Sequence, residues 1–394
     1  MTQPSPLPSP LNVLLVDPSL FTAPYNAGLT EGLVAAGTQP MWATRPTRKG
    51  DRQELPIERT DPFFYRRTDE ANWLPGKLKS VAKGIAHLAG LTTLLWKIRT
   101  RKPDVVHFQW TVLPPLDVLA MLLIRRWCPL VLTVHDTVPF NGERLSFIQN
   151  FGFDVPMRLA HRVIVHTESG RNTLISRGVP AERIVTIPHG ALRLQVPLPV
   201  PVPRADKRYS FLLFGEIKPY KGIDLAIEAL HMLPPEVLRQ TRVVIAGRPR
   251  MDITPLQARI AELGLGDTID LRPQRQSEEE MATVFAEADC LLFPYRQIDA
   301  SGVWFLTKSL GKWVIASRVG IFGAEVEKGQ HGVLLTPGDT ATLAQAIEHA
   351  VTQRPLAKAI SAGDEWAEIG KTTRHLYESL IPVQSASAHI RSSP

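Results

Sequence analysis

"YSFLLFGEIKPYKGIDLAIEALHML", residues 209–233, contains the pattern that decides the fold. It begins with a predominantly apolar run, which is typical of a strand buried on both faces of a parallel sheet. A loop with two lysines follows, and the segment then changes to helical periodicity. One face of the expected helix carries Ile223, Ala226, Ile227 and Leu230. The stretch therefore predicts a strand, a loop and a helix, the repeating unit of a doubly wound α/β domain.

The same unit recurs along the whole chain of 394 residues. In the first half, apolar runs occupy 12–17, 104–110, 130–136, 162–167 and 184–188. In the second half, they occupy 209–215, 242–247, 268–271, 290–295, 313–317 and 332–337. Helical patterns separate these runs, so the sequence predicts two parallel sheets covered by helices.

A proline-rich stretch, "VPLPVPVPR" at 196–204, separates the two series of strands. Alternating prolines suit neither a helix interior nor a sheet and favour an extended spacer. We expect five segments: a disordered lead-in at 1–10, a Rossmann-like domain at 11–195, a linker at 196–208, a second Rossmann-like domain at 209–363, and a C-terminal helix and tail at 364–394. Ligands of such sheets bind beyond the carboxyl ends of the strands, so the expected site faces the cleft between the domains.

Composition excludes several classes of protein. No apolar run approaches the roughly 20 residues that a membrane-spanning helix needs, and the first residues lack the charged and apolar parts of a signal peptide. No known nucleic-acid recognition module is present. Cys128 and Cys290 both lie in apolar surroundings and are expected to be packed thiols in a reducing cytoplasm.

The formal charge of +7 is unevenly distributed. Residues 76–102 contain seven Lys or Arg and no Asp or Glu, and apolar residues recur at helical spacing between Lys77, Lys79 and Lys83. Two interpretations stay open: a basic amphipathic helix that binds an anionic membrane surface, or an ordinary solvated surface helix.

Two loops in the second half have the chemistry of a phosphate site. Lys218 and Lys221 lie between a strand that ends at Gly215 and a helix, where they would neutralise an anion near the helix N-terminus. Ser301 and Gly302 also lie where a helix follows a strand, and glycine lets a ligand oxygen approach the backbone amides closely. Each loop has a structural alternative: solvated lysines in the first, and a simple N-cap of the helix in the second. Together the two loops favour a diphosphate site.

Further motifs make the chain resemble a known family. "FGEIKPYKGIDLAIEAL", "VVIAGR", "AEADCLLFPY", "LGKWVIAS" and "GAEVEKGQHGVLLTPGD" are similar to the C-terminal donor domain of retaining GT-B glycosyltransferases of family 4. "TVHDT" and "RVIVHTESGRNTLISRGVPAERIVTIPHG" resemble the N-terminal half, so the similarity covers roughly residues 11–350. The resemblance implies two Rossmann-like domains that face each other across a cleft, the GT-B fold, with the acceptor side in the first domain.

The resemblance also implies roles for individual residues. Lys221 faces the diphosphate of a nucleotide-sugar and Lys218 accompanies it. His135 lies near the transferred sugar, and Asp299 stands at the first of two positions where relatives have glutamates. The remaining donor-binding positions are Gly215, Gly247, Arg248, Pro273, Gln274, Arg275, Ser301 and Gly302.

The second glutamate position departs from the family pattern. It falls on Thr307 or Leu306, depending on the end from which the spacing is counted, and neither residue is acidic. The "SG" turn suggests a variant branch of the family. Two alternatives to a transferase stay open: a non-catalytic subunit that binds a sugar nucleotide or a partner, and a nucleotide-sugar epimerase.

The resemblance implies retaining transfer of a sugar to a saccharide acceptor, and we expect a lipid-linked acceptor in the synthesis of a bacterial exopolysaccharide or surface glycan. No metal or cofactor is expected beyond the nucleotide-sugar itself, and no nucleic acid. The expected location is the cytoplasm, with contact to the inner face of the plasma membrane through residues 76–102. His107 and His166 are interpreted as structural or cleft-lining histidines, and His189, in a "PHG" turn that resembles the family's, is expected to have a positioning role.

Overall fold

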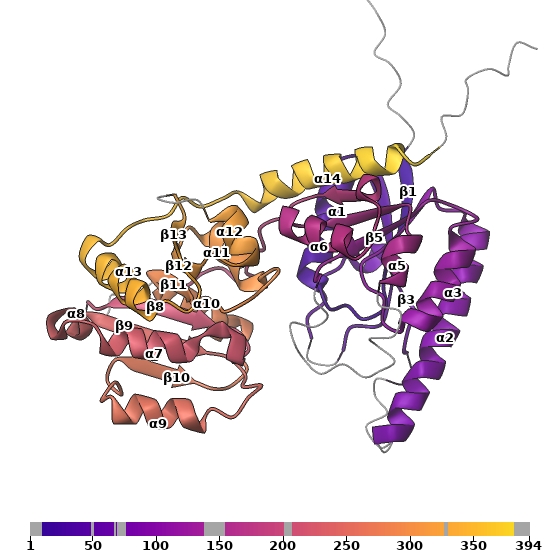
Figure 1. Ribbon diagram of the computed structural model, residues 1–394. Coiled ribbons are helices and arrows are strands. Elements are labelled where there is room, and N and C mark those ends of the chain that lie inside the picture. The colour runs from indigo at the N-terminus through magenta and orange to yellow at the C-terminus, as the bar shows by residue number, and fades with distance from the viewer. Residues whose placement is uncertain are drawn as a thin grey trace, which may run out of the picture.

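The computed structural model describes residues 10–48, 51–66, 68, 76–137, 154–200, 207–326 and 330–381, which form two lobes (Figure 1). Nearly all of the lead-in predicted at 1–10, the middle of the linker predicted at 196–208 and the end of the tail predicted at 364–394 lie outside the described residues.

The N-terminal domain is built on a parallel sheet with the strand order β3-β2-β1-β4-β5-β6-β7. Its strands are β1 (Leu11–Asp17), β2 (Thr38–Thr44), β3 (Thr60–Pro62), β4 (Val105–Phe108), β5 (Leu130–Val134), β6 (Arg162–Val165) and β7 (Ile184–Thr186). Its helices are α1 (Ala23–Ala35), α2 (Gly76–Arg101), α3 (Pro114–Ile124), α5 (Val155–Leu159) and α6 (Glu168–Ser176), with short 3-10 turns at Ile57–Arg59 and Ala181–Arg183. The strand order reverses between β1 and β4, and the site is expected at that point of the sheet edge.

The C-terminal domain repeats this design with the strand order β10-β9-β8-β11-β12-β13. Its strands are β8 (Tyr209–Phe214), β9 (Thr241–Ala246), β10 (Ile269–Arg272), β11 (Cys290–Phe293), β12 (Trp313–Ser317) and β13 (Gly332–Leu335). Its helices are α7 (Ile223–His231), α8 (Pro235–Arg239), α9 (Thr254–Glu262), α10 (Glu278–Glu287), α11 (Gly302–Leu310), α12 (Gly320–Glu325) and α13 (Thr340–Gln353), and a 3-10 turn covers Pro219–Lys221. Both sheets are wholly parallel, which confirms the predicted pair of doubly wound domains.

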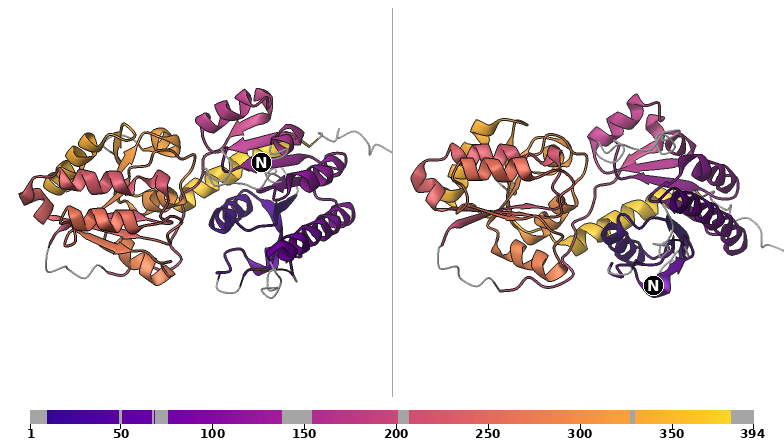
Figure 2. Two further views of the ribbon diagram at one scale, coloured as in Figure 1. Left: turned by 60° about the horizontal axis from the view of Figure 1, so that its bottom comes forward. Right: turned by 90° about the horizontal axis from the view of Figure 1, so that it is seen from below.

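The last helix, α14 (Ala362–Glu378), returns from the C-terminal domain and packs on α1 of the N-terminal domain (Figures 1 and 2). Trp366 is buried against the ring of Tyr25, with ring centroids 5.2 Å apart, and its indole N–H donates to the carbonyl of Ala191 at 2.8 Å. Gly32 and Gly370 let the two helix backbones approach closely, because a Cβ on either glycine would overlap the other helix. The C-terminal helix is therefore part of the N-terminal domain's core.

Two apolar layers in each domain cover the two faces of its sheet. Among the described residues, no helix is long and apolar enough to cross a membrane.

Candidate active site

The loop between β8 and α7 holds Lys221 in a fixed position. Gly222 follows the short 3-10 turn with a φ of 66°, and a Cβ there would overlap the carbonyl of Pro294, so only glycine fits. The Lys221 side chain is 8% exposed, and its Nζ donates to the carbonyl of Phe214 at 2.8 Å and lies 5.5 Å from the ring centre of Tyr295. Its ammonium group is thus held close to the end of strand β8.

Burial lowers the pKa of Lys221 to about 8; Glu216 opposes the shift and Lys218 adds to it. The Lys218 ammonium lies 3.2 Å from the carboxylate of Glu216. Two cations close together in a partly dry site repel each other, and an incoming anion would relieve that repulsion.

The ends of β8 and β9 come unusually close to each other. Gly247 has a φ of 153°, and a Cβ there would overlap the carbonyl of Gly215. A Cβ on Gly215 would in turn lie 2.8 Å from Nζ of Lys221. Gly215 therefore keeps a side chain out of the space beside the lysine, and Gly247 lets the two strand ends approach each other.

The Ser301–Gly302 turn also contacts Tyr295. Ser301 is the N-cap of α11: its hydroxyl accepts a hydrogen bond from the Trp304 N–H at 3.3 Å and also hydrogen-bonds Tyr295. Gly302 is the first residue of the helix, and no atom lies within 4 Å of the place where its Cβ would be. The first amides of a helix have no acceptor within the helix. Ser301 caps the Trp304 amide, and among the hydrogen bonds of the described residues the Gly302 and Val303 amides have no acceptor. The structure thus places Gly215, Lys221, Ser301 and Gly302 together around Tyr295.

Asp299, two residues before this turn, reaches across to the N-terminal domain. Its Oδ2 accepts hydrogen bonds from the Thr137 backbone N–H at 2.8 Å and from the Thr137 hydroxyl at 2.6 Å. Thr137 follows β5 and the His135–Asp136 pair. Burial and then the charge of Asp299 raise the pKa of Asp136 to about 6, while Lys218 acts in the opposite direction. Residues from both domains therefore share one electrostatic environment.

His135 lies at the end of β5 and is buried, with its ring stacked on Trp110 at a centroid distance of 5.2 Å. Its Nε2 lies 3.2 Å from Oε1 of Gln109 and its Nδ1 lies 3.1 Å from Nε2 of His166. Burial lowers the pKa of His135 well below its usual range, and neighbouring histidines add to the shift. The imidazole is consequently neutral at physiological pH.

The other expected donor residues lie further along the sheet edge, at the ends of β9 and β10. Arg248 and Gln274 are exposed. The guanidinium of Arg275 lies 3.7 Å from the carboxylate of Asp51 in the N-terminal domain. Pro273 is half-buried at the end of β10, and the Gly247 N–H donates to the carbonyl of Arg272 at 3.1 Å, which fixes the two strand ends relative to each other. None of these side chains contacts Lys221 or Ser301 in the hydrogen bonds and ion pairs found among the described residues.

The two candidates for the second acidic position are both buried. Thr307 donates its hydroxyl to the carbonyl of Val303, and Leu306 belongs to the apolar layer. The next residue, Lys308, is 4% exposed and joins the two halves of the chain: its Nζ lies 3.1 Å from Glu325 and 3.1 Å from Glu365 of α14, and 3.4 Å from the His189 carbonyl. The C-terminal part of α11 therefore connects the C-terminal domain to α14 and to the N-terminal domain.

Sequence reasoning missed Asp136, Thr137 and the role of Lys308. Asp136 had a usable signal, since it directly follows the candidate histidine at a strand end. Thr137 and Lys308 had none, because their partners are distant in sequence. Within the described residues, no group of three or more His, Cys, Asp or Glu side chains is arranged to hold a metal ion.

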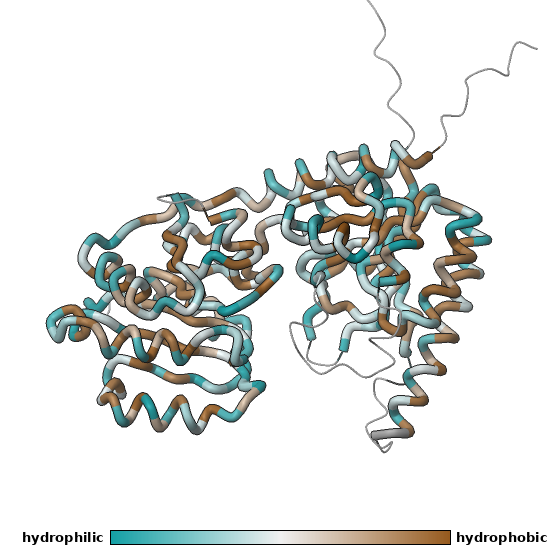
Figure 3. The backbone as a smooth tube through the Cα atoms, viewed as in Figure 1, coloured by the Kyte–Doolittle hydropathy of each residue, from teal (hydrophilic) through white to brown (hydrophobic). Residues whose placement is uncertain are grey.

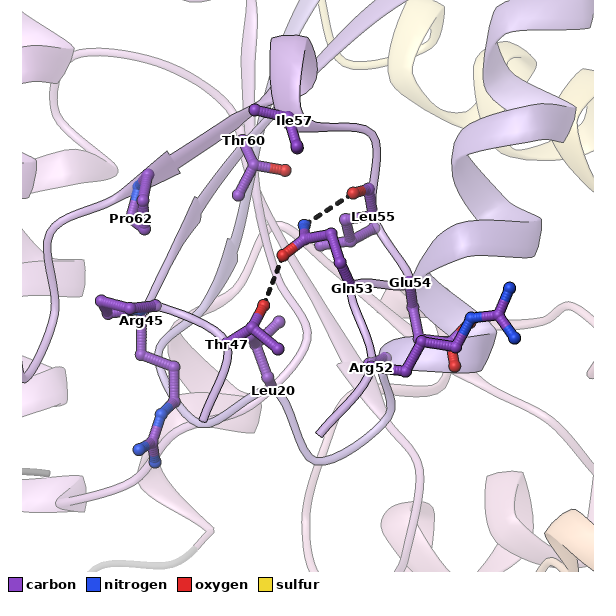
Figure 4. Close-up of a pocket in the computed structure, with 12 residues that line it drawn as sticks. Leu20, Arg45, Thr47, Arg52, Gln53, Glu54, Leu55, Ile57, Thr60 and Pro62 are labelled. Carbon is purple, nitrogen blue, oxygen red and sulfur yellow. Dashed lines mark hydrogen bonds between the residues drawn. The ribbon is translucent and has the colours of Figure 1, made fainter. Parts of the chain in front are cut away.

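A cavity of about 310 Å³ lies in the N-terminal domain beside the start of α1 (Figure 4). Its walls are largely apolar, and Arg45 and Arg52 lie on opposite sides of the hydrogen-bonded Thr47–Gln53 pair. Arg52 is adjacent to Asp51, which pairs with Arg275, so this rim of the cavity faces the C-terminal domain.

Comparisons with known proteins agree with this architecture. The family model described as glycosyl transferases group 1 matches residues 199–364, and the model described as glycosyltransferase family 4 matches residues 23–191. D-inositol 3-phosphate glycosyltransferase of Mycobacterium tuberculosis is 27% identical over 273 residues, covering 62% of this chain and 53% of that protein. The chain thus spans about half the length of the curated relatives it matches.

Two solved structures share the whole fold. Anabaena HepE in complex with UDP-glucose has a TM-score of 0.61 at 17% identity and covers 94% of this chain and 95% of its own. The lipopolysaccharide outer core galactosyltransferase WaaB has a TM-score of 0.62 at 14% identity, with 93% and 99% covered. With both halves matched by the family's models, the chain belongs to the family-4 glycosyltransferases, glycosyl transferases group 1, of the GT-B fold.

Proposed function

We propose that this chain is a retaining glycosyltransferase that moves a sugar from a nucleoside-diphosphate sugar to a saccharide acceptor. The observation that carries the proposal is the meeting of the two domains at Asp299 and Thr137. This contact brings Lys218 and the Ser301–Gly302 turn of one domain to the His135–Asp136 pair of the other. A donor held on the first set would present its sugar to the second.

The chemistry required of the C-terminal domain is stabilisation of a leaving group. As the bond between the anomeric carbon and the diphosphate oxygen breaks, negative charge builds on the diphosphate. The ammonium of Lys221, assisted by Lys218, and the amides at the start of α11 are preorganised to receive that charge. This is the largest catalytic contribution we assign to the chain. The positions proposed for the nucleotide are Gly247, Arg248 and the 273–275 loop, and Asp299 is proposed to lie beside the sugar.

The N-terminal domain would hold the acceptor hydroxyl against the anomeric carbon. Asp136, ionised above about pH 6, is suited to accept a hydrogen bond from that hydroxyl. Closure of the domains, with Asp299 on Thr137, would fix the distance between the two reactants and exclude water. We assign no covalent intermediate to this reaction.

The acceptor is proposed to be a lipid-linked saccharide of a bacterial surface glycan or exopolysaccharide. In support, the cavity beside α1 combines apolar walls with two arginines, which suits an acceptor with apolar and anionic parts. The names of the relatives mention an inositol phosphate in one case and lipopolysaccharide in another. Because these two names differ, the proposal for the acceptor rests on the cavity of this chain and not on the relatives.

Helix α2 supports a membrane-bound acceptor, because its N-terminal half exposes an apolar stripe. Leu78, Val81, Ile85 and Leu88 are 57%, 61%, 65% and 48% exposed, at a spacing that places them on one side of the helix. Lys83 is exposed within the same stretch, and this end of α2 extends beyond the neighbouring helices (Figures 1 and 3). An exposed apolar stripe on a helix without acidic residues suits the interface of a bilayer, and Lys83 on the opposite side of the helix adds positive charge that favours anionic lipid. We place the chain at the cytoplasmic face of the plasma membrane, where its two free cysteines suit a reducing compartment.

A second candidate, a non-catalytic sugar-nucleotide-binding subunit, is favoured by one observation: Thr307 and Leu306 fill the second acidic position and are buried. The buried Lys221 beside the N-terminus of α11 argues for catalysis. Burying a charged lysine costs free energy, and a catalytic role would explain why the residue is there.

The test separates these functions. Thermal-shift measurements against UDP-, GDP- and ADP-sugars first identify the donor, since a ligand of the folded state raises its melting temperature. Release of nucleoside diphosphate is then measured with and without a bacterial lipid extract. Acceptor-dependent release supports the transferase, with retention of the anomeric configuration checked on the product. Conversion of the sugar without acceptor indicates an epimerase, and binding without turnover indicates a non-catalytic subunit.

A further inference from the structure

A row of buried histidines runs along the carboxyl edge of the N-terminal sheet and ends at His135. His166, at the end of the neighbouring strand β6, lies between His135 and the backbone: its Nδ1 is 3.0 Å from the carbonyl oxygen of Ile187, and its Nε2 is 3.1 Å from Nδ1 of His135. Both rings are almost completely buried. The contact between the two rings is consequently shielded from bulk water.

The direction of each hydrogen bond follows from the carbonyl at one end. A carbonyl oxygen only accepts, so Nδ1 of His166 must carry the hydrogen. Burial lowers the pKa of His166 to about 4, so its ring is neutral near pH 7 and its Nε2 carries a lone pair. That lone pair must accept from Nδ1–H of His135.

In the opposite tautomer of His166, with the hydrogen on Nε2, two buried acceptors would face each other. If Nε2 of His166 carried the hydrogen, its bare Nδ1 would lie 3.0 Å from the oxygen of Ile187. A buried polar group without a partner is costly, and the cost favours one tautomer by roughly 5- to 150-fold. The Ile187 carbonyl therefore selects the tautomer of both rings.

The second nitrogen of His135 is left as an acceptor by the same argument. Its Nε2 lies 3.2 Å from Oε1 of Gln109, and two acceptors do not bond. The contact becomes favourable if the Gln109 amide turns its NH2 group toward the ring, or if a hydroxyl group takes its place. His135, Gln109, Trp110 and Asp136 all line one pocket at the end of β4 and β5.

We propose that His166 is a positioning residue, which together with the Ile187 carbonyl holds His135 as the Nδ1–H tautomer, so that its Nε2 accepts a hydrogen bond from a hydroxyl group of the bound sugar. The role in sugar binding rests on the proposed transferase function, whereas the tautomer does not. Gln109, with its amide turned so that the NH2 group faces the ring, satisfies Nε2 until a sugar arrives. A donor sugar that lacks the matching hydroxyl would leave Nε2 without that partner.

The experiment reads the tautomer directly, by nitrogen NMR of the full chain labelled with 15N-histidine. Protonated and unprotonated ring nitrogens have well-separated shifts, and the His135 signals are identified by their loss in His135→Asn. We expect a protonated Nδ1 and an unprotonated Nε2 in the wild type without any ligand. A protonated Nε2 on His135 overturns the proposal.

Two variants of His166 test the positioning role. His166→Gln keeps an acceptor near the place of Nε2 and should retain the tautomer and kcat/KM within about threefold. His166→Phe keeps the ring volume but removes the acceptor; it should give a mixture of tautomers and lower kcat/KM at least tenfold. His161→Phe changes a histidine that lies just before β6, at the opposite end of that strand from His166, and that accepts a hydrogen bond from the Leu130 N–H at 3.0 Å; it should leave the His135 tautomer unchanged. An unchanged tautomer in His166→Phe contradicts the proposal.

The positioning role of His166 and the transferase function can be disproved independently. If the resting tautomer is as stated but no donor is turned over, the proposed transferase function is wrong. The hydrogen bond from His135 to His166 and the tautomer that it fixes are then still supported. If transfer is observed and His166→Phe transfers as fast as the wild type despite a mixed tautomer, the positioning role fails and the transferase stands.

Discussion

Asp299 of the C-terminal domain accepts two hydrogen bonds from Thr137 of the N-terminal domain, one from the backbone N–H at 2.8 Å and one from the hydroxyl at 2.6 Å. The two residues are separated by 162 positions in the chain. Asp299 precedes the proposed donor turn, and Thr137 follows the His135–Asp136 pair. The contact therefore connects the two halves of the proposed reaction, and a change in one half should be measurable in the other.

The first prediction concerns the pH dependence of kcat/KM, which reports groups of the free enzyme. Asp136, with a pKa of about 6, acts as a hydrogen-bond acceptor only when ionised, so activity should rise as the pH rises through about 6. Lys221, with a pKa of about 8, attracts the diphosphate only when protonated, so activity should fall as the pH rises through about 8. A bell-shaped profile between these values is expected. Activity that stays constant from pH 5 to pH 9 would show that neither group titrates in a required role.

Asp299→Asn tests the coupling between the domains. The charge of Asp299 helps to raise the pKa of Asp136, so its removal should move the acidic limb of the profile toward lower pH, by up to about one unit. Asn keeps an oxygen that accepts from the Thr137 N–H, which limits the structural disturbance. Thr137→Val, which removes only the hydroxyl contact and keeps the Asp299 charge, is the matched control and should leave the limb in place. Equal shifts in both variants would assign the effect to domain contact and not to charge.

The third prediction concerns the charge of Lys221. Lys221→Met preserves the length and apolar packing of the side chain but removes the ammonium, and we expect kcat to fall by about 10²-fold or more, a typical loss for one group that stabilises transition-state charge. Burial of the wild-type ammonium is costly, so the melting temperature of the variant should not fall. Transfer within threefold of the wild type, measured with the identified donor, would remove Lys221 from the mechanism.

The fourth prediction uses the open space at Gly302. Ala fits there without a clash and is the better helix former, so Gly302→Ala should fold with unchanged or slightly raised stability. Its methyl group would nevertheless stand where a ligand oxygen approaches the amides, so donor affinity should weaken at least tenfold. Gly266→Ala, also in open space but distant from the site, is the control and should bind as the wild type does. Equal affinity in the two variants, measured by calorimetry, would contradict a donor site at this turn.

The fifth prediction tests the membrane surface of α2. Ile85→Glu places a charge in the exposed apolar stripe and should reduce co-sedimentation with phosphatidylglycerol-containing vesicles about tenfold, since burial of one such side chain contributes roughly 1.5–3 kcal/mol. Leu356→Glu makes the same change at a residue of the C-terminal domain that is 89% exposed, and should bind vesicles as the wild type does. Loss of binding in both variants would indicate an effect of net charge, and loss in neither would remove the stripe from the interface.

The sequence predicts most of the C-terminal domain because most of its strands contain continuous apolar runs bounded by loops; β10, which reads "IDLR", is the exception. It predicts less of the N-terminal sheet. Strand β2 reads "TQPMWAT", and its internal proline and polar residues break the apolar pattern. Strand β3 has only three residues. Strand β2 forms because β1 supplies a buried partner, and β3 then pairs with β2; local sequence does not reveal either pairing.

The residues of the candidate site also fall into those that the sequence predicts and those that it does not. Lys221, Ser301 and Gly302 are local features, since each lies in a turn that the surrounding residues determine. Asp136, Thr137 and Lys308 depend on contacts between distant segments. The charge of Asp299 adds to the raised pKa of Asp136 only after the two domains meet, and the Lys308 contact with Glu365 forms only after α14 has docked. Reasoning from strand and loop patterns cannot supply such contacts.

The measurement closest to the central claim is a crystal structure of the wild-type chain with the nucleoside diphosphate of its donor. The account predicts the diphosphate within hydrogen-bonding distance of the Lys221 ammonium and of the backbone amides that open α11. A well-occupied diphosphate bound elsewhere on the chain, with Lys221 still bonded only to the Phe214 carbonyl, would contradict it.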